Sequence, residues 1–529
     1  MKHLLSVICA AALCVSGFTQ YAGADINVVP LPKEVKPLQG QFTLDENTVI
    51  NYSAETKEAA GFLADWLKLS GSNVRSTVLN TSPAKNSILF QSGGKKYPDG
   101  GYTLIIKPEN ITVLSSNSAG WFYAAQTLRQ LFSESKTTDA VEIDDAPRFV
   151  WRGFLLDISR HFFDKEQIKR HIDRMAMYKL NSLQFHLSDD QAWRIEIKRY
   201  PKLIEIGSIG ECGNPKAPSR FLTQTDFKEI IEYAAKRHIR IVPETEMPAH
   251  IGSAVRSYPE IACNPNRLTG MCCPGKDATL RFLEGMLDEI CEVFPSQFIH
   301  IGGDECSKAE WKNCPDCQKR MKDNNLKDYN ELQSWFIRHF DKYLADKGRR
   351  LIGWDEILEG GLAPAATVMS WRGKDHGRAA NKGGLAAAKM GHEVVFTPTD
   401  YCYFDAAQFV PPFEDAQSRK ALNDGHRYAG YHPITVEKIF SYDPAEGFSP
   451  EEAAKILGVQ ANMWTESCGT EPDMEWKVFP RLIALAEVAW VQPANKDAAG
   501  FMKRLATARE QLVKQGISAA PLKWEPAGK

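Results

Sequence analysis

The sequence predicts an α/β protein in which a (β/α)8 TIM barrel follows a small α+β domain. Between residues 153 and 463, eight short apolar runs each lead into polar or acidic residues and then into a helical stretch. The runs are almost continuously apolar, as expected for parallel strands buried on both faces. A doubly wound open sheet is the alternative, but the sequence has no glycine-rich dinucleotide motif or P-loop to support it.

Residues 1–24 have the pattern of a signal peptide. Lys2 gives a basic start, Leu4–Gly17 is an apolar stretch too short for a membrane-spanning helix, and Ala22-Gly23-Ala24 fits a signal-peptidase site. We therefore predict export, to the periplasm or out of the cell, with Asp25 as the first mature residue. No later run is long and apolar enough for a membrane helix, so membrane insertion is not expected.

Residues 25–148 are predicted to form the small α+β domain. Strand-like runs at Gly101–Lys107 and Ile111–Leu114 alternate with stretches at Thr56–Leu69 and Gly120–Phe132, where apolar residues recur at helical spacing. Turns that contain proline or glycine separate these elements. The short polar segment 144–148 is the expected junction with the next domain.

Residues 149–495 are predicted to form the barrel, and residues 496–529 a C-terminal helix and tail. The last amphipathic stretch, 500–515, is expected to pack on the outside. The predicted strands are Gly153–Ile158, Ser182–Leu187, Ile239–Pro243, Phe298–Gly302, Arg350–Trp354, Thr367–Trp371, Glu393–Thr397 and Leu457–Met463. The predicted connecting helices are Lys165–Tyr178, Gln224–Lys236, Ala278–Val293, Glu331–Lys347 and Glu475–Trp490.

Polar and aromatic side chains stand where the predicted strands end. TIM barrels place their functional groups at these carboxyl ends, in the loops that lead to the helices. In strand order, the candidates are Arg160; Asp189; Glu246 and His250; Asp304 and Glu305; Trp354; Trp371; Tyr403 and Asp405; and Trp464 and Glu466.

Tryptophans and carboxylates in one mouth indicate sugar binding, because an indole stacks on the C–H face of a pyranose while carboxylates and arginine bond its hydroxyls. Acids at strand ends also point to glycosidic cleavage, which needs a proton donor and a group that stabilises an oxocarbenium-like transition state. Taken singly, a tryptophan is more often core and an aspartate more often a helix cap. Their coincidence at most of the eight strand ends favours the functional interpretation.

The fourth strand leads through Gly302-Gly303 into two adjacent acids, Asp304 and Glu305. Neighbours on a regular strand point to opposite faces, but a pair at a strand-to-loop transition can turn both side chains into the mouth. One acid could then protonate the leaving oxygen while the other acts on a different part of the same sugar. Repulsion and partial burial are expected to raise one pKa, as a general acid at neutral pH requires.

These motifs resemble glycoside hydrolase family 20, the β-N-acetylhexosaminidases, over nearly the whole chain after residue 24. His300-Ile-Gly-Gly-Asp-Glu305 is the most specific match. The other matching segments, in the family's order, are Gly101–Leu104 and Gly120–Leu131 in its non-catalytic α+β domain, then Trp151–His161, Gly353–Glu356, Ser370–Arg372, Tyr403–Asp405 and Trp464–Glu466 in its catalytic barrel.

The resemblance implies an exo-acting enzyme that hydrolyses terminal non-reducing N-acetyl-D-hexosamine residues, GlcNAc or GalNAc, from glycans. In such enzymes the substrate's own 2-acetamido oxygen is the nucleophile, and an oxazolinium intermediate forms with overall retention. The implied roles are Glu305 as general acid and then base, Asp304 as the residue that orients the acetamido group, Tyr403 as a donor to its oxygen, Trp354, Trp371 and Trp464 as pocket walls, Arg160, Asp405 and Glu466 as partners of ring hydroxyls, and Asp189, His250 and Glu246 as supporting residues.

Two features of the sequence depart from the family's pattern or lie outside it. The third-strand motif has Glu246 and Ala249 where the family more often has Asp and Gly, so the longer carboxylate could move the hydrogen-bond partner of His250. Cys306, directly after the acid pair, is not needed by the mechanism and is expected to serve packing only.

Ten of the twelve cysteines lie after residue 24. Export permits disulfides, but sequence alone does not give their pairing. Cys314-Pro-Asp-Cys317, with Cys306 nearby, could form a metal knot, but no second paired-cysteine motif completes a set of four ligands. The sequence therefore favours a disulfide or free thiols and predicts no metal and no cofactor.

Composition and motifs leave three alternatives open. A hydrolase that releases a disaccharide such as lacto-N-biose would use the same acids and differ in pocket depth. A catalytically inactive carbohydrate-binding protein would have no need of Asp304, Glu305 and Tyr403 together. A metal-dependent amidohydrolase barrel would want a His-x-His pair at the first strand, which the stretch from Asp157 to Arg160 does not contain.

The charge balance bears on partners. The chain carries 64 Lys and Arg against 66 Asp and Glu, so it offers no electrostatic case for a nucleic acid. The expected partner is a glycan or oligosaccharide with a terminal N-acetylhexosamine. The sequence leaves open the preference between GlcNAc and GalNAc, and also the oligomeric state.

Overall fold

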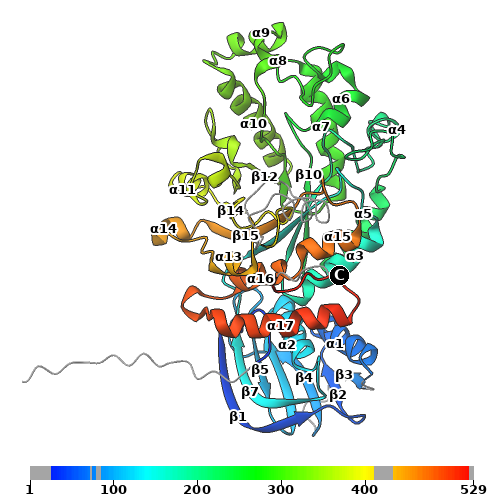
Figure 1. Cartoon of the computed structure of the whole chain (residues 1–529), viewed down its shortest axis with the longest axis vertical. Coiled ribbons are helices and arrows are strands. Elements are labelled where there is room, and N and C mark those ends of the chain that lie inside the picture. Colours follow the sequence, from blue (N-terminus) through cyan, green and yellow to red (C-terminus); the bar gives the residue numbers. More distant parts are fainter. Residues whose placement is uncertain (1–25, 72–73, 79–84, 410–432, 524–529) are drawn as a thin grey trace, which may run out of the picture.

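The computed structural model describes residues 26–71, 74–78, 85–409 and 433–523, and the predicted signal peptide lies outside them. The described chain forms two units, a sheet domain at one end and a barrel that fills the rest of the molecule (Figure 1). Within the described residues, no helix is long and apolar enough to cross a membrane.

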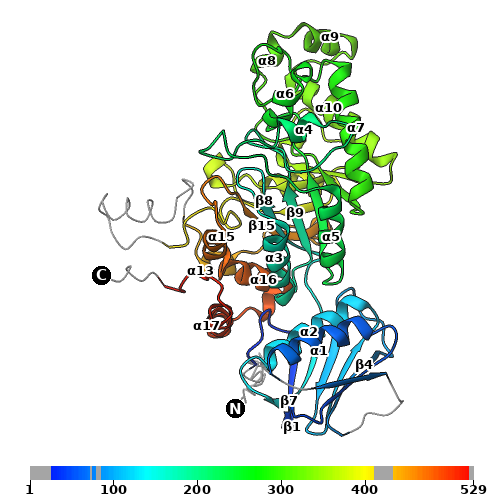
Figure 2. The same cartoon turned by 90° about the vertical axis from the view of Figure 1, so that its right-hand side faces the viewer.

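The N-terminal unit is one seven-stranded sheet in the order β1-β7-β5-β6-β4-β2-β3, with both helices on one face (Figure 2). Its helices bury Leu63 and Leu67 from one and Phe122 and Leu128 from the other. The strands are β1 (Glu34–Thr43), β2 (Val49–Tyr52), β3 (Arg75–Val78), β4 (Ser87–Ser92), β5 (Tyr102–Ile106), β6 (Asn110–Ser115) and β7 (Thr137–Asp145), and the helices are α1 (Lys57–Leu69) and α2 (Ser118–Leu131).

The second unit is a closed barrel of eight parallel strands, which confirms the predicted fold class. The apolar runs form strands because each is buried on both faces, toward the barrel interior and toward the helices. The strands are β8 (Trp151–Asp157), β9 (Ser182–His186), β10 (Arg240–Glu244), β11 (Phe298–His300), β12 (Arg350–Trp354), β13 (Thr367–Ser370), β14 (Val394–Phe396) and β15 (Ile456–Met463).

The helices surround the barrel, and one prediction about them is wrong in detail. The stretch predicted as one helix from Glu475 to Trp490 is two helices, α15 (Glu471–Val478) and α16 (Arg481–Trp490). Pro480 separates them, because proline has no N–H to continue the helical ladder. The other long helices of the barrel are α3 (Lys165–Met177), α5 (Gln224–Ala235), α7 (Asp277–Val293) and α10 (Tyr329–Ala345).

Smaller helices extend two of the loops. The segment after β10 contains α6 (Gly252–Ser257) and the short η1 (Pro259–Ile261), and the segment after β11 contains α8 (Ala309–Lys312) and α9 (Pro315–Asp323). These helices gather at the end of the molecule farthest from the small domain (Figures 1 and 2). The loops after the third and fourth barrel strands are therefore neighbours in space as well as in barrel order.

The two units meet through buried polar contacts around Asp145, the last residue of β7. Its carboxylate forms a fully buried ion pair with Lys179 at 3.1 Å and accepts from the indole N–H of Trp490 at 2.8 Å. Helix α17 (Ala498–Lys514) lies along this junction (Figure 1), where Arg504 pairs with Glu487 and Gln511 donates to Glu134 at 3.1 Å. The C-terminal helix thus contacts both units instead of only the outside of the barrel.

Candidate active site

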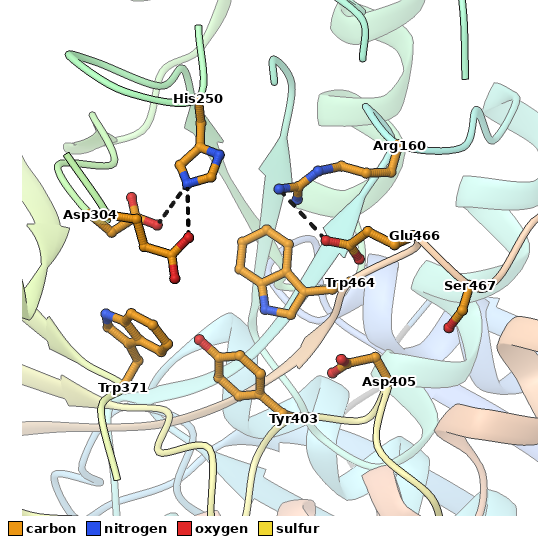
Figure 3. Close-up of a pocket in the computed structure, with 10 residues that line it drawn as sticks. Arg160, His250, Asp304, Trp371, Tyr403, Asp405, Trp464, Glu466 and Ser467 are labelled. Atoms are coloured by element: carbon orange, nitrogen blue, oxygen red, sulfur yellow. Dashed lines mark ion pairs between the residues drawn. The ribbon is translucent and has the colours of Figure 1, made fainter. Parts of the chain in front are cut away.

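A cavity of about 370 Å³ opens at the carboxyl ends of the barrel strands. This volume lies in the range of pockets that take small ligands. The lining residues are Arg160, His250, Asp304, Glu305, Trp371, Tyr403, Asp405, Trp464, Glu466 and Ser467 (Figure 3). All but Ser467 are residues that the sequence analysis singled out, and they come from six of the eight strand ends.

The loop after β11 turns both adjacent acids into this cavity. Gly302 and Gly303 adopt φ values of 72° and 98°, a region that favours glycine. Glu305 itself has a φ of 45°, which is uncommon for a residue with a side chain and occurs where the surrounding structure enforces it. The backbone therefore departs from strand geometry, and the alternation that would separate Asp304 from Glu305 is lost.

Three hydrogen bonds hold this loop in place. The amide of Gln333, in α10, donates to the carbonyl of Gly303 at 2.7 Å, and the Gln333 side chain is buried. The backbone N–H of Trp354 donates to the carbonyl of Gly302 at 2.9 Å, and the N–H of Gly302 reaches Nδ1 of His300 at 3.0 Å. A Cβ on Gly302 would lie 1.5 Å from Oε2 of Glu246, so only glycine leaves room for that carboxyl group.

His250 connects the acid pair to the rest of the site. It is another non-glycine residue with positive φ, at 49°. Its Nε2 lies 3.7 Å from Oδ2 of Asp304 and 3.4 Å from Oε2 of Glu305 (Figure 3). Its Nδ1 lies 3.4 Å from Oδ1 of Asp189. Burial lowers the pKa of His250, but the carboxylates of Asp189, Glu305 and Asp304 outweigh it and leave the pKa above its usual value.

The two acids have pKa values that shift in opposite directions. Burial raises the pKa of Asp304, and His250 opposes this only in part. The hydrogen bond with His250 lowers the pKa of Glu305, whose side chain is 57% exposed. The expected raised pKa therefore occurs on Asp304, while the residue expected to be the general acid has a lowered one, because it is still open to solvent beside an imidazole that favours the charged form.

Arg160 is fixed by carboxylates on three sides. Its guanidinium lies 2.5 Å from Asp189, 3.3 Å from Asp157 and 3.7 Å from Glu466, and it sits 5.1 Å from the ring centroid of Trp464. These charges raise its pKa although burial acts against them. A buried guanidinium held in this way can present a planar fork of donors to sugar hydroxyls.

Aromatic rings form the walls of the cavity. Trp371 and Tyr403 are stacked with centroids 6.0 Å apart, and Tyr403 and Trp464 lie 6.3 Å apart (Figure 3). The indole N–H of Trp371 donates to Glu356 at 2.9 Å, which fixes the ring. Trp354 is not among the lining residues, and it packs behind Trp464 at 5.9 Å.

Among the residues that line the cavity, two carboxylate oxygens are buried and have no hydrogen-bond partner in the part of the chain that the structure describes. They are Oδ1 of Asp304 and Oδ1 of Asp405. Burial raises the pKa of Asp405 to about 7, and the negative charge of Glu466 acts in the same direction. Buried polar groups are normally paired, so unpaired ones that line a cavity are candidates for bonds to a ligand.

Glu246, the residue that departs from the family's pattern, lies below the cavity. It is buried against Glu244 and 3.8 Å from His186, and its pKa is well above the usual value because of burial and the charge of Asp304. Asp189, the other supporting residue predicted, lies behind the lining and contacts both His250 and Arg160. The partner of Nδ1 of His250 is thus Asp189. The longer side chain of Glu246 lies instead in a buried group with His186 and Glu244.

Two residues of the site were not predicted from the sequence. Ser467 lines the cavity, and its position directly after Glu466 was the only signal for it. Gln333 holds the acid loop from the second turn of α10, and nothing in its sequence context distinguishes it from an ordinary helical glutamine.

Comparison with known proteins gives matches along most of the chain. Residues 149–493 match the model for the glycosyl hydrolase family 20 catalytic domain, and residues 25–146 match that for the family's domain 2. A β-hexosaminidase of Porphyromonas gingivalis is 41% identical over 95% of this chain, which spans 65% of that protein's length. A β-hexosaminidase of Vibrio furnissii is 31% identical, with 88% of this chain and 76% of that protein covered.

Solved structures agree with these matches. The family 20 exo-β-N-acetylglucosaminidase from Vibrio harveyi, in complex with N-acetylglucosamine, superposes with a TM-score of 0.82 at 29% identity and covers 95% of this chain and 79% of its own. The β-N-acetylhexosaminidase from Bacteroides fragilis gives a TM-score of 0.80 at 30% identity, with 94% and 97% covered.

Proposed function

The chain belongs to glycosyl hydrolase family 20, and from this premise we propose that it is an exo-acting β-N-acetylhexosaminidase that uses substrate-assisted, retaining catalysis. Its substrates are glycans that end in a non-reducing N-acetyl-D-hexosamine. The observation that carries the proposal is the pair Asp304 and Glu305, which enters one tryptophan-walled cavity with His250 against both carboxylates.

The first step is the departure of the leaving group. Glu305 gives its proton to the glycosidic oxygen as the bond from that oxygen to the anomeric carbon breaks. The acetamido oxygen of the same sugar forms the new bond to the anomeric carbon, and an oxazolinium ion results. A sugar that covers the exposed face of Glu305 removes water from it, which raises its pKa toward the value that a general acid needs.

Asp304 supports the nucleophile. Its unpaired Oδ1 can accept a hydrogen bond from the acetamido N–H, which orients the amide oxygen toward the anomeric carbon. Positive charge then develops on the amide nitrogen next to this carboxylate, so the interaction is stronger in the transition state than in the substrate. The imidazolium of His250 contacts both carboxylates, so it reduces the repulsion between them and holds them in position.

The second step reverses the proton transfer. Glu305, now a carboxylate, takes a proton from water while the water oxygen attacks the anomeric carbon and the bond to the amide oxygen breaks. Tyr403 directs its hydroxyl into the cavity, where it can donate to the acetamido oxygen (Figure 3). Arg160, Asp405 and Glu466 supply the donors and acceptors for the ring hydroxyls, and Trp371 and Trp464 cover the apolar faces.

Purified protein and a set of nitrophenyl glycosides test this function. We expect turnover of the β-linked GlcNAc or GalNAc glycoside and no release of a disaccharide from the lacto-N-bioside. Activity only on the disaccharide glycoside would favour a lacto-N-biosidase, and binding without any turnover would favour a carbohydrate-binding protein.

Export to the periplasm or beyond the cell is part of the same proposal, and it rests on the leader pattern of residues 1–24. N-terminal sequencing of the protein from cell fractions tests it. Mature protein that starts at Asp25 in an exported fraction supports the proposal, and an uncleaved cytoplasmic chain would contradict it.

A further inference from the structure

Four cysteine sulfurs meet outside the cavity, between the loops that follow the third and fourth barrel strands. Cys263 and Cys273 lie in the segment between η1 and α7, after β10. Cys314 is the residue before α9 and Cys317 is in its first turn, after β11. All four sulfurs lie within 4.8 Å of one another, and three of the cysteines are buried while Cys263 is half-buried.

The spacing of these sulfurs matches metal coordination. The Sγ atom of Cys273 lies 3.5 Å from that of Cys317 and 3.6 Å from that of Cys314. The Sγ atoms of Cys263 and Cys317 are 3.8 Å apart. A tetrahedral zinc with Zn–S bonds of about 2.3 Å has sulfur–sulfur edges of about 3.8 Å. A disulfide would bring two of the sulfurs to about 2.05 Å, and one sulfur here, Cys273, is close to two partners at once.

The surroundings favour thiolates at this point. Cys314 and Cys317 stand at the N-terminus of α9, where the helix dipole stabilises negative charge. A Cβ on Gly275 would lie 2.3 Å from the backbone nitrogen of Cys317, so this close approach of the two segments requires glycine.

We propose that Cys263, Cys273, Cys314 and Cys317 bind one zinc ion in a structural site. Four thiolates without an open position are the donor set of a closed, tetrahedral zinc centre. A four-ligand set was not expected from the sequence because it contains only one Cys-x-x-Cys motif, whereas the second pair, Cys263 and Cys273, is ten residues apart and comes from a different loop. Cys306, then considered as a ligand, is not one of the four.

The site joins the two loops that carry the reacting acids and their imidazole. The four sulfurs share a small hydrophobic cluster with Ala249, next to His250, and with Cys306, next to Glu305. The backbone N–H of Cys272 donates to the carbonyl of Pro248 at 2.9 Å, so the segment before Cys273 is bonded directly to the His250 loop. In this proposal, zinc fixes the position of the two loops relative to each other and takes no part in the reaction.

Metal analysis of the purified holoprotein tests the proposal. We expect about one zinc per chain after dialysis, and loss of that zinc in the double variant C314S/C317S. Cys306→Ala is the matched control, because Cys306 is a buried cysteine of the same cluster outside the set of four, and it should keep the zinc. Wild-type protein without stoichiometric metal, even after zinc is supplied, would overturn the proposal, and stoichiometric iron would overturn the zinc assignment.

Two further measurements keep the proposal falsifiable if the double variant does not fold. Cys263→Ser removes the most exposed ligand, and we expect its zinc to pass to a competing chelator dye at least about tenfold more readily than that of the wild type. Alkylation in denaturant with chelator and without reductant should label all four cysteines. Peptide masses that show disulfides among the four instead would overturn it.

Discussion

The carboxylates of Asp145 and Asp304 lie in two different regions of the molecule and differ in whether both of their oxygens have hydrogen-bond partners. Asp145, at the junction of the small domain and the barrel, has a donor for each oxygen, whereas Asp304, in the cavity, has one buried oxygen with no partner among the described residues. The donors to Asp145 are Tyr102 at 2.7 Å, Trp490 at 2.8 Å, the N–H groups of Lys33 and Ala146 at 3.0 Å, and Lys179 at 3.1 Å.

Backbone conformation separates the two regions in the same way once the neighbouring secondary structure is considered. Lys179 in the junction and Glu305 in the cavity both have positive φ, at 61° and 45°. Lys179 lies just after the end of α3, where a left-handed residue commonly closes a helix, while Glu305 ends no helix. Buried charge and positive φ therefore occur in both places, and the feature that distinguishes Asp304 from Asp145 is an unpaired oxygen in a residue that lines the cavity.

The largest expected effect comes from the cavity. Glu305→Gln keeps the shape of the side chain and removes the proton, so we expect kcat to fall by about 10²–10⁴-fold while KM changes little. Steady-state kinetics on a nitrophenyl β-GlcNAc glycoside measures this. The melting temperature should not fall, because the residue is more than half exposed. Turnover close to that of the wild type would remove Glu305 from its role.

The junction should respond in the opposite way. Asp145→Asn leaves the buried Lys179 without its counter-charge, and we expect a loss of about 3–5 kcal/mol in the free energy of unfolding. Activity per folded molecule should stay unchanged. Asp139→Asn, on the same strand but exposed, is the control and should change stability by less than about 0.5 kcal/mol. A drop in kcat without a loss of stability would show that the junction is not purely structural.

Asp304→Asn sharpens the comparison between the junction and the cavity, because it removes the negative charge of this carboxylate in the cavity. We expect kcat/KM to fall on the order of 10²-fold, because the amide stabilises the developing positive charge less well. Stability should stay the same or rise, because an unpaired buried carboxylate is costly. Urea unfolding together with kinetics measures both. A large destabilisation would place Asp304 with Asp145 as a structural acid.

The last expected effect is a pH dependence of stability. The pKa of Asp405 is raised from 3.8 to about 7, so the folded state holds a proton there that the unfolded state has lost. Stability from this residue is therefore present below about pH 4 and is lost as the pH rises toward about 7. Urea midpoints for Asp405→Asn should fall less than those of the wild type over this window. Parallel pH profiles would refute the assignment.

Much of the fold and of the site could be predicted from the sequence. Apolar runs predict the barrel strands because a parallel strand that is buried on both faces is apolar along its length, and β12 begins and ends where its apolar run does. The strand-end residues gather because a barrel brings all carboxyl ends to one face, so Arg160 and Glu466 meet from the two ends of the barrel sequence.

The rest depends on contacts that the chain order does not carry. Gln333 reaches Gly303 from a helix whose rotation no pattern fixes, and the lowered pKa of Glu305 follows from its exposure and from the place of His250. The set of four cysteines was missed for the same reason, because two loops from different strands contribute to it. Pro480 was visible in the sequence, but its position inside an apolar helical pattern concealed the break between α15 and α16.

The most direct test of the central claim replaces the nucleophile that the substrate provides. We would compare kcat/KM for two nitrophenyl β-glycosides that are identical except for an acetamido or a hydroxyl group at the 2-position. If Asp304 and Glu305 serve an attack by the amide oxygen, the hydroxyl compound will show no measurable turnover. Cleavage of both glycosides at similar rates would contradict the account and indicate an ordinary retaining mechanism with a protein nucleophile.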